Sequence, residues 1–538
     1  MNSGLHWIDY IIVFLSVVAA IWIGLHFARR QKTTSGFFTA SESHIPAWAI
    51  GISIFATLIS SVTFLSYPEA GYNGNWILLV QGLMVPIVLV GMIGFIVPLY
   101  RRVIKISAYE YFERRFGLLA RVYSSLAFVF TNFSKMGTIF FLLSVAIASF
   151  FGIHATNPNY VTLLCIFIAV LGLTIVILTM LGGLEAVIWM DVLQGFLLIA
   201  GGLVCVGLLL FLPEGGPSYV ISTAFTEKKI SLGPYYWSLK DLTFWVMVIN
   251  GIFYAVQKYG TDQAIVQRYL TAKDDRSAKK ASFLGIGLSV PVWTLFMFIG
   301  SCLWVYFHQT PALSAEVAQM NTSEVFPYFI STRIPVGMAG LVVAALVAAA
   351  ISSLDSDMNC IAAIGVQDYY ARFKPKSTDK QRLRVGRLII LISGVCSIGV
   401  GMLYAFWGGQ GILGTLFGLY AIFSAGIVGL FLLGLFSRRA NKQGLYVGLA
   451  CAVLFTAWAM LTSPMNVAGE KKIILDLGAW NYTHHTYMLG VYSHIIVFVV
   501  GWLASFLFKS EPAPDNLTIY GYLAERRAEK AAKKAADE

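Results

Sequence analysis

The chain has 538 residues, of which 58% are hydrophobic and only 12% are charged. A soluble globular protein carries about twice that fraction of charged residues, so the composition indicates an integral membrane protein that crosses the bilayer many times. The formal net charge of +11 would suit a nucleic-acid partner, but the basic residues lie in short loops between apolar runs, as membrane topology requires. We therefore expect the lipid bilayer as a partner and no nucleic acid.

Runs of apolar residues long enough to span a membrane as helices recur along the whole chain. The thirteen predicted spans cover residues 7–28, 47–67, 77–99, 122–152, 160–181, 184–212, 241–267, 281–307, 335–363, 387–406, 410–437, 441–462 and 486–508. Together, the segments 28–32, 101–121, 268–280, 371–387 and 438–442 and the tail from Lys509 hold 30 of the 38 lysines and arginines. These segments all fall on one side of the membrane, which the positive-inside rule makes cytoplasmic. The sequence thus predicts an all-α, multi-pass protein of the plasma membrane, with its N-terminus outside and its C-terminus in the cytoplasm.

Two of these spans have polar or small residues at membrane depth. The span 47–67 is rich in small and hydroxylated residues, and the span 241–267 contains Asn250-Gly251 and a polar run from Gln257 to Gln263. Both spans look like interrupted helices, and they lie five spans apart. Paired interruptions indicate an inverted-repeat transporter with its site near the midplane, although small residues can also serve only close helix packing.

The chain accordingly divides into five predicted parts. They are an extra N-terminal helix and loop (1–46), a first five-helix repeat (47–212), a second five-helix repeat (213–437), two C-terminal helices (438–508) and a cytoplasmic tail (509–538).

Several charged residues lie inside predicted spans. Lys135 is about fourteen residues from the cytoplasmic end of its span, or about 20 Å at the helical rise, which is too deep to reach the interface easily. It should therefore face a water-filled cavity, a carboxylate or an anionic substrate, and Lys258 is similar. Asp191 lies about two turns into its span, where a carboxylate is usually paired or functional; a purely structural hydrogen bond is the alternative.

The run from Ala348 to Asp357 ends an apolar segment with three serines and two aspartates in six residues. On a helix, one face carries Ser352, Asp355, Ser356 and Asn359. Such a face is costly in lipid unless something binds it, and oxygen ligands suit a small hard cation. The alternative is the solvated cytoplasmic end of a membrane helix. The acids that we expect near a cation path are Asp191, Asp355 and Asp357.

Several motifs together resemble the sodium:solute symporter family over roughly residues 5–510. They are Phe55-Ala56-Thr57 to Thr63, Ser107-Ala108-Tyr109-Glu110-Tyr111, Leu181 to Ala186 with Trp189 and Asp191, Gln267-Arg268-Tyr269, Ala349 to Ser356, and Phe431 to Phe436. Within the family the chain is similar to the bacterial sialic-acid transporter branch and also to sodium/glucose cotransporters. The resemblance implies a LeuT-type five-plus-five inverted repeat with about thirteen transmembrane helices, and alternating access driven by the sodium gradient.

The resemblance also implies which residues bind. The sodium ligands would be the carbonyls of Ala56, Ile59 and Ala349 and the hydroxyls of Ser352 and Ser353. A second cation site matches Asp191, Ser353, Asp355 and Ser356. Asp355 stands where a hydroxyl is usual, and this extra carboxylate could strengthen a second sodium site, bind a proton or pair with a lysine.

For the substrate, the resemblance suggests the hydroxyls of Ser60 and Thr63, and Gln81 if the register slips by one residue. Lys135 matches an arginine that holds a substrate carboxylate; lysine keeps the charge but loses the two-pronged geometry. We add Lys258 because of its depth in its span.

These observations predict a sodium-coupled symporter, not an enzyme, which imports a sugar or sugar acid such as a sialic acid. We expect sodium as its only metal and the monomer as its functional form. One alternative is a symporter for a neutral sugar, a polyol or another small metabolite. Another is a symporter-like membrane sensor, for which a tail of about thirty residues is too short to hold a kinase. A third is an integral-membrane enzyme, for which no catalytic constellation is evident. A channel of the same fold is the last alternative.

Overall fold

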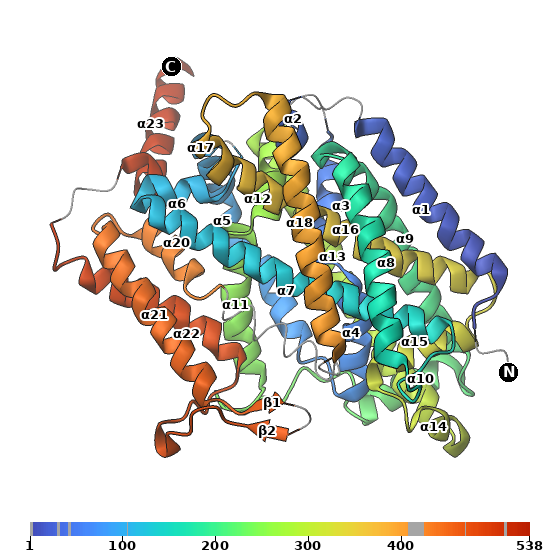
Figure 1. Cartoon of the computed structure of the whole chain (residues 1–538). Coiled ribbons are helices and arrows are strands. Elements are labelled where there is room, and N and C mark those ends of the chain that lie inside the picture. Colours follow the sequence, from blue (N-terminus) through green and yellow to red (C-terminus); the bar gives the residue numbers. More distant parts are fainter. Residues whose placement is uncertain are drawn as a thin grey trace.

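The computed structural model describes residues 4–28, 33–40, 45–104, 106–406, 424–467, 470–509 and 514–537. It is helical almost throughout, and β1 (Met465–Val467) pairs antiparallel with β2 (Glu470–Lys472) in a small hairpin (Figure 1). Within the described residues, ten helices are long and apolar enough to cross a membrane, or eleven spans if the bent pair α3–α4 counts as one. The prediction of an all-α membrane protein is confirmed.

The membrane-length helices are α1 (Trp7–Ala28), α5 (Leu79–Val103), α7 (Leu118–Phe150), α8 (Tyr160–Leu181), α9 (Leu184–Phe211), α13 (Asp275–His308), α16 (Met338–Ile364), α18 (Asp379–Phe406), α21 (Lys442–Thr462) and α22 (Tyr487–Ala504). The shorter helices are α2 (Thr34–Thr39), α3 (Ala47–Leu58), α4 (Ser61–Asn73), α6 (Tyr109–Phe116), α10 (Gly216–Thr226), α11 (Phe244–Gly260), α12 (Gln263–Thr271), α14 (Pro311–Val317), α15 (Thr322–Arg333), α17 (Ala371–Phe373), α20 (Ile427–Phe436) and α23 (Ile519–Asp537). Single turns of other helix types are η1 (Gly365–Tyr370), η2 (Gly478–Trp480) and η3 (Asp515–Leu517). Figure 1 shows α21 and α22 at one side of the bundle and α1 at the other.

Eleven of the thirteen predicted spans correspond to a membrane-length helix or to the bent pair. The predicted span 241–267 consists of α11 and α12, and α11 ends at Gly260, which lies after the Asn250-Gly251 pair. The predicted span 410–437 lies partly outside the described residues, and its described end forms α20. The division into two five-helix repeats stays a prediction.

The break between α3 and α4 bends the chain by 55°. Ile59 is extended, with φ −104° and ψ 116°, and Ser60 caps α4 by accepting a hydrogen bond from the Val62 amide at 3.2 Å. A serine at this position stabilises a helix start because it satisfies an otherwise free N–H group. The break also leaves helix-end carbonyls without partners in the helix, and such backbone is tolerated at membrane depth only inside protein or beside a cavity.

Helix α16 lies in the middle of the bundle and packs against α1, α3, α4, α7, α8, α9 and α18. Consequently no side chain from Ser352 to Asp357 exposes more than 2% of its surface. The interpretation of this run as a solvated helix end is therefore wrong, and its hydroxyls and carboxylates must find their partners on the surrounding helices.

Helices α4 and α13 touch through their backbones. A Cβ atom on Gly300 would lie 2.2 Å from the carbonyl oxygen of Pro68, and one on Gly71 would lie 2.5 Å from that of Met297. These two glycines therefore set how closely α13 approaches α4, and no larger residue fits at either position without moving one helix.

We predict that Gly300→Ala lowers the melting temperature of the purified protein, because overpacking of this kind costs about 1–3 kcal/mol. Gly287→Ala is the matched control, since a Cβ there meets no atom within 4 Å on the same helix α13. Both changes raise helix propensity equally. A Gly300→Ala protein that melts like Gly287→Ala would contradict the close contact.

Candidate functional site

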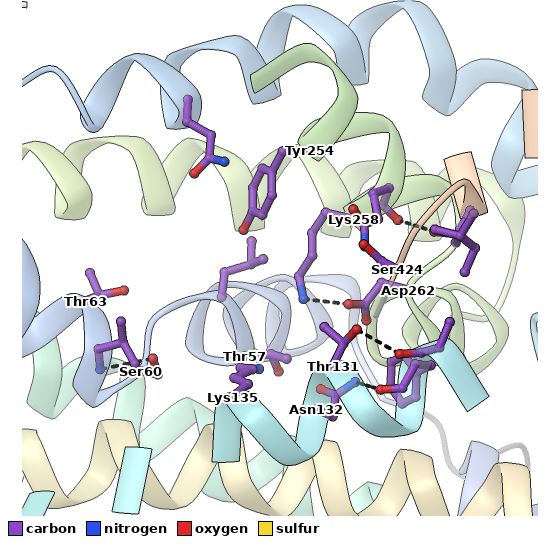
Figure 2. Close-up of a pocket in the computed structure, with 18 of the residues that line it drawn as sticks. Thr57, Ser60, Thr63, Thr131, Asn132, Lys135, Tyr254, Lys258, Asp262 and Ser424 are labelled. Carbon is purple, nitrogen blue, oxygen red and sulfur yellow. Dashed lines mark hydrogen bonds and ion pairs between the residues drawn. The ribbon is translucent and has the colours of Figure 1, made fainter. Parts of the chain in front are cut away.

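A cavity of about 120 Å³ lies beside both helix breaks, between α4, α5, α7 and α11 (Figure 2). A single water needs roughly 10–15 Å³ of such space, so the cavity has room for several waters. All the predicted substrate residues line it, namely Ser60, Thr63, Gln81, Lys135 and Lys258. The structure therefore brings these five residues, from four separate elements, to one place.

Sequence reasoning missed further polar residues that line the cavity. They are Thr57, Tyr67, Tyr109, Thr131, Asn132, Tyr254, Gln257, Thr261, Asp262 and Ser424. Helical spacing could have found several of them. Thr131 and Asn132 lie four and three residues before Lys135, and Tyr254 lies four residues before Lys258, so each shares a face with a buried lysine.

Both lysines in the cavity form ion pairs. The Lys135 ammonium lies 2.8 Å from Oδ2 of Asp357 on α16, and the Lys258 ammonium lies 2.7 Å from Oδ2 of Asp262 (Figure 2 shows the second pair). The depth of Lys135 predicted a cavity, a carboxylate or an anionic substrate beside it, and the structure provides the first two. Because the four charges cancel, the cavity carries no net charge from these groups.

The five predicted sodium ligands converge where the break in α3–α4 meets α16. The Ser352 hydroxyl lies 3.2 Å from the carbonyl oxygens of Ala56 and Ala349. The Ser353 hydroxyl lies 3.5 Å from the carbonyl oxygen of Ile59. Such a cluster of neutral oxygens, several of them freed by a helix break, is a chemically suitable environment for a hard monovalent cation. That it binds sodium stays a prediction.

The residues predicted for a second cation site have different hydrogen-bond partners. Asp191 accepts hydrogen bonds from Ser53 at 2.5 Å and from the Arg268 guanidinium at 3.1 Å, and that guanidinium also donates to Ser356 at 2.9 Å. Asp355 accepts instead from Thr179 on α8. Among the described residues, Asp355 forms no ion pair with a lysine.

Arg268 is the residue of this region that sequence reasoning misplaced. The sequence placed it in a cytoplasmic loop, but it lies on α12 with its side chain fully buried, as is that of Asp191. Arg268 also donates to the Ser53 hydroxyl at 2.8 Å and to the Ala264 carbonyl at 2.8 Å. A cation at Asp191 would have to compete with this guanidinium. The second site stays a prediction.

A chain of amides joins the cavity to the C-terminal helices. Gln81 on α5 donates to Asn250 on α11 at 2.6 Å, and Asn250 donates to the Tyr487 carbonyl at the start of α22 at 2.9 Å. A second, smaller cavity lies beyond these residues and shares Gln81 and Tyr254 with the first. The two cavities therefore adjoin at Gln81 and Tyr254.

Comparison with known proteins gives three results. Residues 37–452 match the sequence profile of the family described as "Sodium:solute symporter family". The sodium/sialic acid symporter NanT of Aliivibrio fischeri is 30% identical over 528 residues, which are 98% of each chain. A solved structure described as the substrate-bound outward-open state of a Na+-coupled sialic acid symporter is 30% identical, covers 95% of this chain and 99% of its own, and superposes with a TM-score of 0.81.

A more distant structure agrees on the fold alone. Mhp1, described as a nucleobase-cation-symport-1 family transporter, is 16% identical, with a TM-score of 0.51 over 88% of this chain and 94% of its own. The fold is thus LeuT-type, as the sequence predicted.

We predict that Ser352→Ala and Ser353→Ala each abolish the stimulation of solute uptake by sodium, because each removes a hydroxyl from the predicted cation site. The measurement is uptake into proteoliposomes with and without an inward sodium gradient. Ser289→Ala is the control, since among the described residues its buried hydroxyl bonds only to the Gly285 carbonyl of its own helix. Undiminished sodium-dependent uptake in both variants would rule out the proposed ligands.

Proposed function

The chain belongs to the sodium:solute symporter family, and from that premise we propose that it imports a carboxylated, hydroxylated solute of the sialic-acid type. It is a sodium-coupled solute symporter and a multi-pass membrane protein, and it is a transporter rather than an enzyme. We further propose inward transport by alternating access, a cytoplasmic C-terminus and a functional monomer.

One observation carries the choice of substrate. Lys135 lines the same cavity as Ser60 and Thr63. A cationic group beside hydroxyls is the arrangement that suits a carboxylate attached to a sugar ring, because the charge-assisted hydrogen bond supplies strength and the hydroxyls supply orientation. Lysine acts here as a point charge, so it holds a carboxylate without fixing its plane.

The surrounding residues suit a solute larger than a simple sugar. Tyr254 and Trp293 give the cavity apolar walls, and the smaller cavity past Gln81 extends the available space. The two relatives compared above are described as sialic acid symporters, which supports the same class of substrate for this chain.

Sodium binding at the α3–α4 break would act directly on the solute residues. Ile59, whose carbonyl faces Ser353, is adjacent to Ser60, which lines the cavity. A cation held by these oxygens would therefore bind the same segment that presents Ser60 and Thr63 to the cavity. The membrane potential adds roughly 2.3 kcal/mol per charge per 100 mV to the driving force for import.

A neutral sugar or polyol is the second candidate substrate. The observation in its favour is that Asp357 and Asp262 already neutralise both lysines in the cavity. A neutral solute would bind without disturbing either pair, whereas an acid must compete with a carboxylate for its lysine.

We predict that Lys135→Ala reduces uptake of a sialic acid by at least about tenfold, since a charge-assisted hydrogen bond contributes about 1.5–3 kcal/mol. Uptake of a neutral sugar should change far less. Lys135→Arg is the control, because it keeps the positive charge and should retain most acid uptake. Both solutes are followed as radiolabelled compounds in proteoliposomes, and equal losses for acid and neutral sugar would contradict the carboxylate assignment.

A further inference from the structure

The two ion pairs of the cavity differ in what they connect. Lys258 and Asp262 are four residues apart at the α11–α12 break, so that pair is local. Lys135 is on α7 and Asp357 is on α16, and 222 residues separate them. The second pair therefore joins a helix that lines the solute cavity to the helix that carries Ser352 and Ser353.

Asp357 depends on Lys135 for its neutralisation. It is 1% exposed, and its Oδ1 and Oδ2 lie 3.1 Å and 2.8 Å from the Lys135 ammonium, which is the cation paired with it. Lys258, the other cation near it, is already held by Asp262. A buried carboxylate that loses its one partner is strongly unfavourable, so whatever draws Lys135 away creates a demand for another cation near Asp357.

Asp357 also lies one helical turn from the predicted sodium ligands. Ser353 and Asp357 are four residues apart on α16, so their side chains are neighbours on one face. The Ser353 hydroxyl faces the carbonyl of Ile59 at the helix break, while Asp357 faces Lys135. An unpaired carboxylate at Asp357 would therefore lie close to a cation among these oxygens.

We infer that Asp357 is an exchangeable counter-ion, which the carboxylate of an anionic solute displaces from Lys135, so that the freed Asp357 strengthens cation binding beside Ser353. The inference rests on the proposed function, since it needs an acidic solute. In the empty site Lys135 and Asp357 neutralise each other. In the loaded site the solute carboxylate neutralises Lys135 and the sodium ion neutralises Asp357, so each charge keeps a partner throughout.

This exchange makes the binding of solute and sodium mutually dependent. Asp357 competes with the solute for Lys135 when sodium is absent, and sodium removes that competitor by attracting Asp357. By thermodynamic linkage, the factor by which sodium tightens the acid equals the factor by which the acid tightens sodium. A neutral solute leaves the pair intact and gains nothing from this exchange.

The test is a binding measurement on the purified full-length protein, with a sialic acid and its neutral methyl ester, in sodium or in choline. In choline, Asp357→Asn should bind the acid at least about fivefold more tightly than the wild type does, and sodium should tighten the acid by a correspondingly smaller factor. The methyl ester should bind both proteins alike. An Asp357→Asn protein that binds the acid no tighter in choline, or that keeps the full effect of sodium, would overturn the inference.

Two further variants serve as controls. Asp357→Glu keeps the carboxylate but changes the size of the side chain, and it should behave like the wild type. A role that depended on side-chain volume instead of charge would not give this result. Glu316→Gln removes an acid from a different ion pair, that with Arg333, away from the cavity. It should leave both binding constants of the acid unchanged.

Lys135→Gln tests the same exchange from the other partner, in case Asp357→Asn does not fold. It leaves Asp357 without a lysine, so sodium binding in the absence of any solute should become severalfold tighter than in the wild type, and unchanged or weaker sodium binding would overturn the counter-ion role. Failure of the proposed function gives a different result. The wild-type protein would then bind a neutral sugar and no sugar acid, with or without sodium, while the sodium affinity of Lys135→Gln would still report on Asp357.

Discussion

The cost of a polar group without a partner inside the membrane governs the arrangement of this protein. Helix α16 shows it most directly, because its polar run is buried on every side and its side chains contact four different neighbours. Ser352 and Ser353 face the broken α3–α4 segment, Asp355 faces α8, Ser356 faces Arg268 of α12, and Asp357 faces α7. Each of these neighbours thus supplies a hydrogen-bond or ion-pair partner for a different part of the polar run of α16.

The two helix breaks have a common chemistry. Ser60 caps α4 and Asp262 caps α12, each by accepting a hydrogen bond from a backbone N–H group, and both residues line the cavity. Two helix N-termini therefore start at the cavity, and the partial positive charge at each N-terminus favours an anionic group nearby. At the first break, the carbonyls that end α3 lie against α16. The same interruption thus offers N–H dipoles to the solute and carbonyl oxygens to the cation.

Hydropathy predicted the positions of eleven of the thirteen expected spans, because it depends on the bilayer alone. Hydroxylated and polar residues at membrane depth also predicted the two helix breaks, although Asn250-Gly251 lies inside the continuous helix α11. The sequence did not predict which buried charges pair with each other. Lys135 with Asp357, and Asp191 with Arg268, lie 222 and 77 residues apart, and such pairings depend on the depth and rotation of two helices at once. Helical spacing placed Asp355 on one face with Ser352 and Ser356. On a helix surrounded by protein, however, side chains that differ in direction by about 60–100° around the helix axis can contact different neighbouring helices. Arg268 was misplaced because a charge near the end of a span looks the same in sequence whether it is solvated or paired.

Helix α13 holds both halves of the broken α3–α4 segment. Its backbone touches α4 at Gly300, and at Gly285 a Cβ would lie 2.6 Å from the Ile54 side chain of α3. With each half fixed to the same partner, the 55° bend has little freedom to open or close by itself. The break is then a rigid corner and not a hinge, so the three helices should shift together as one body. Access to the cavity would have to change at the surfaces where that body meets α7, α9 and α16.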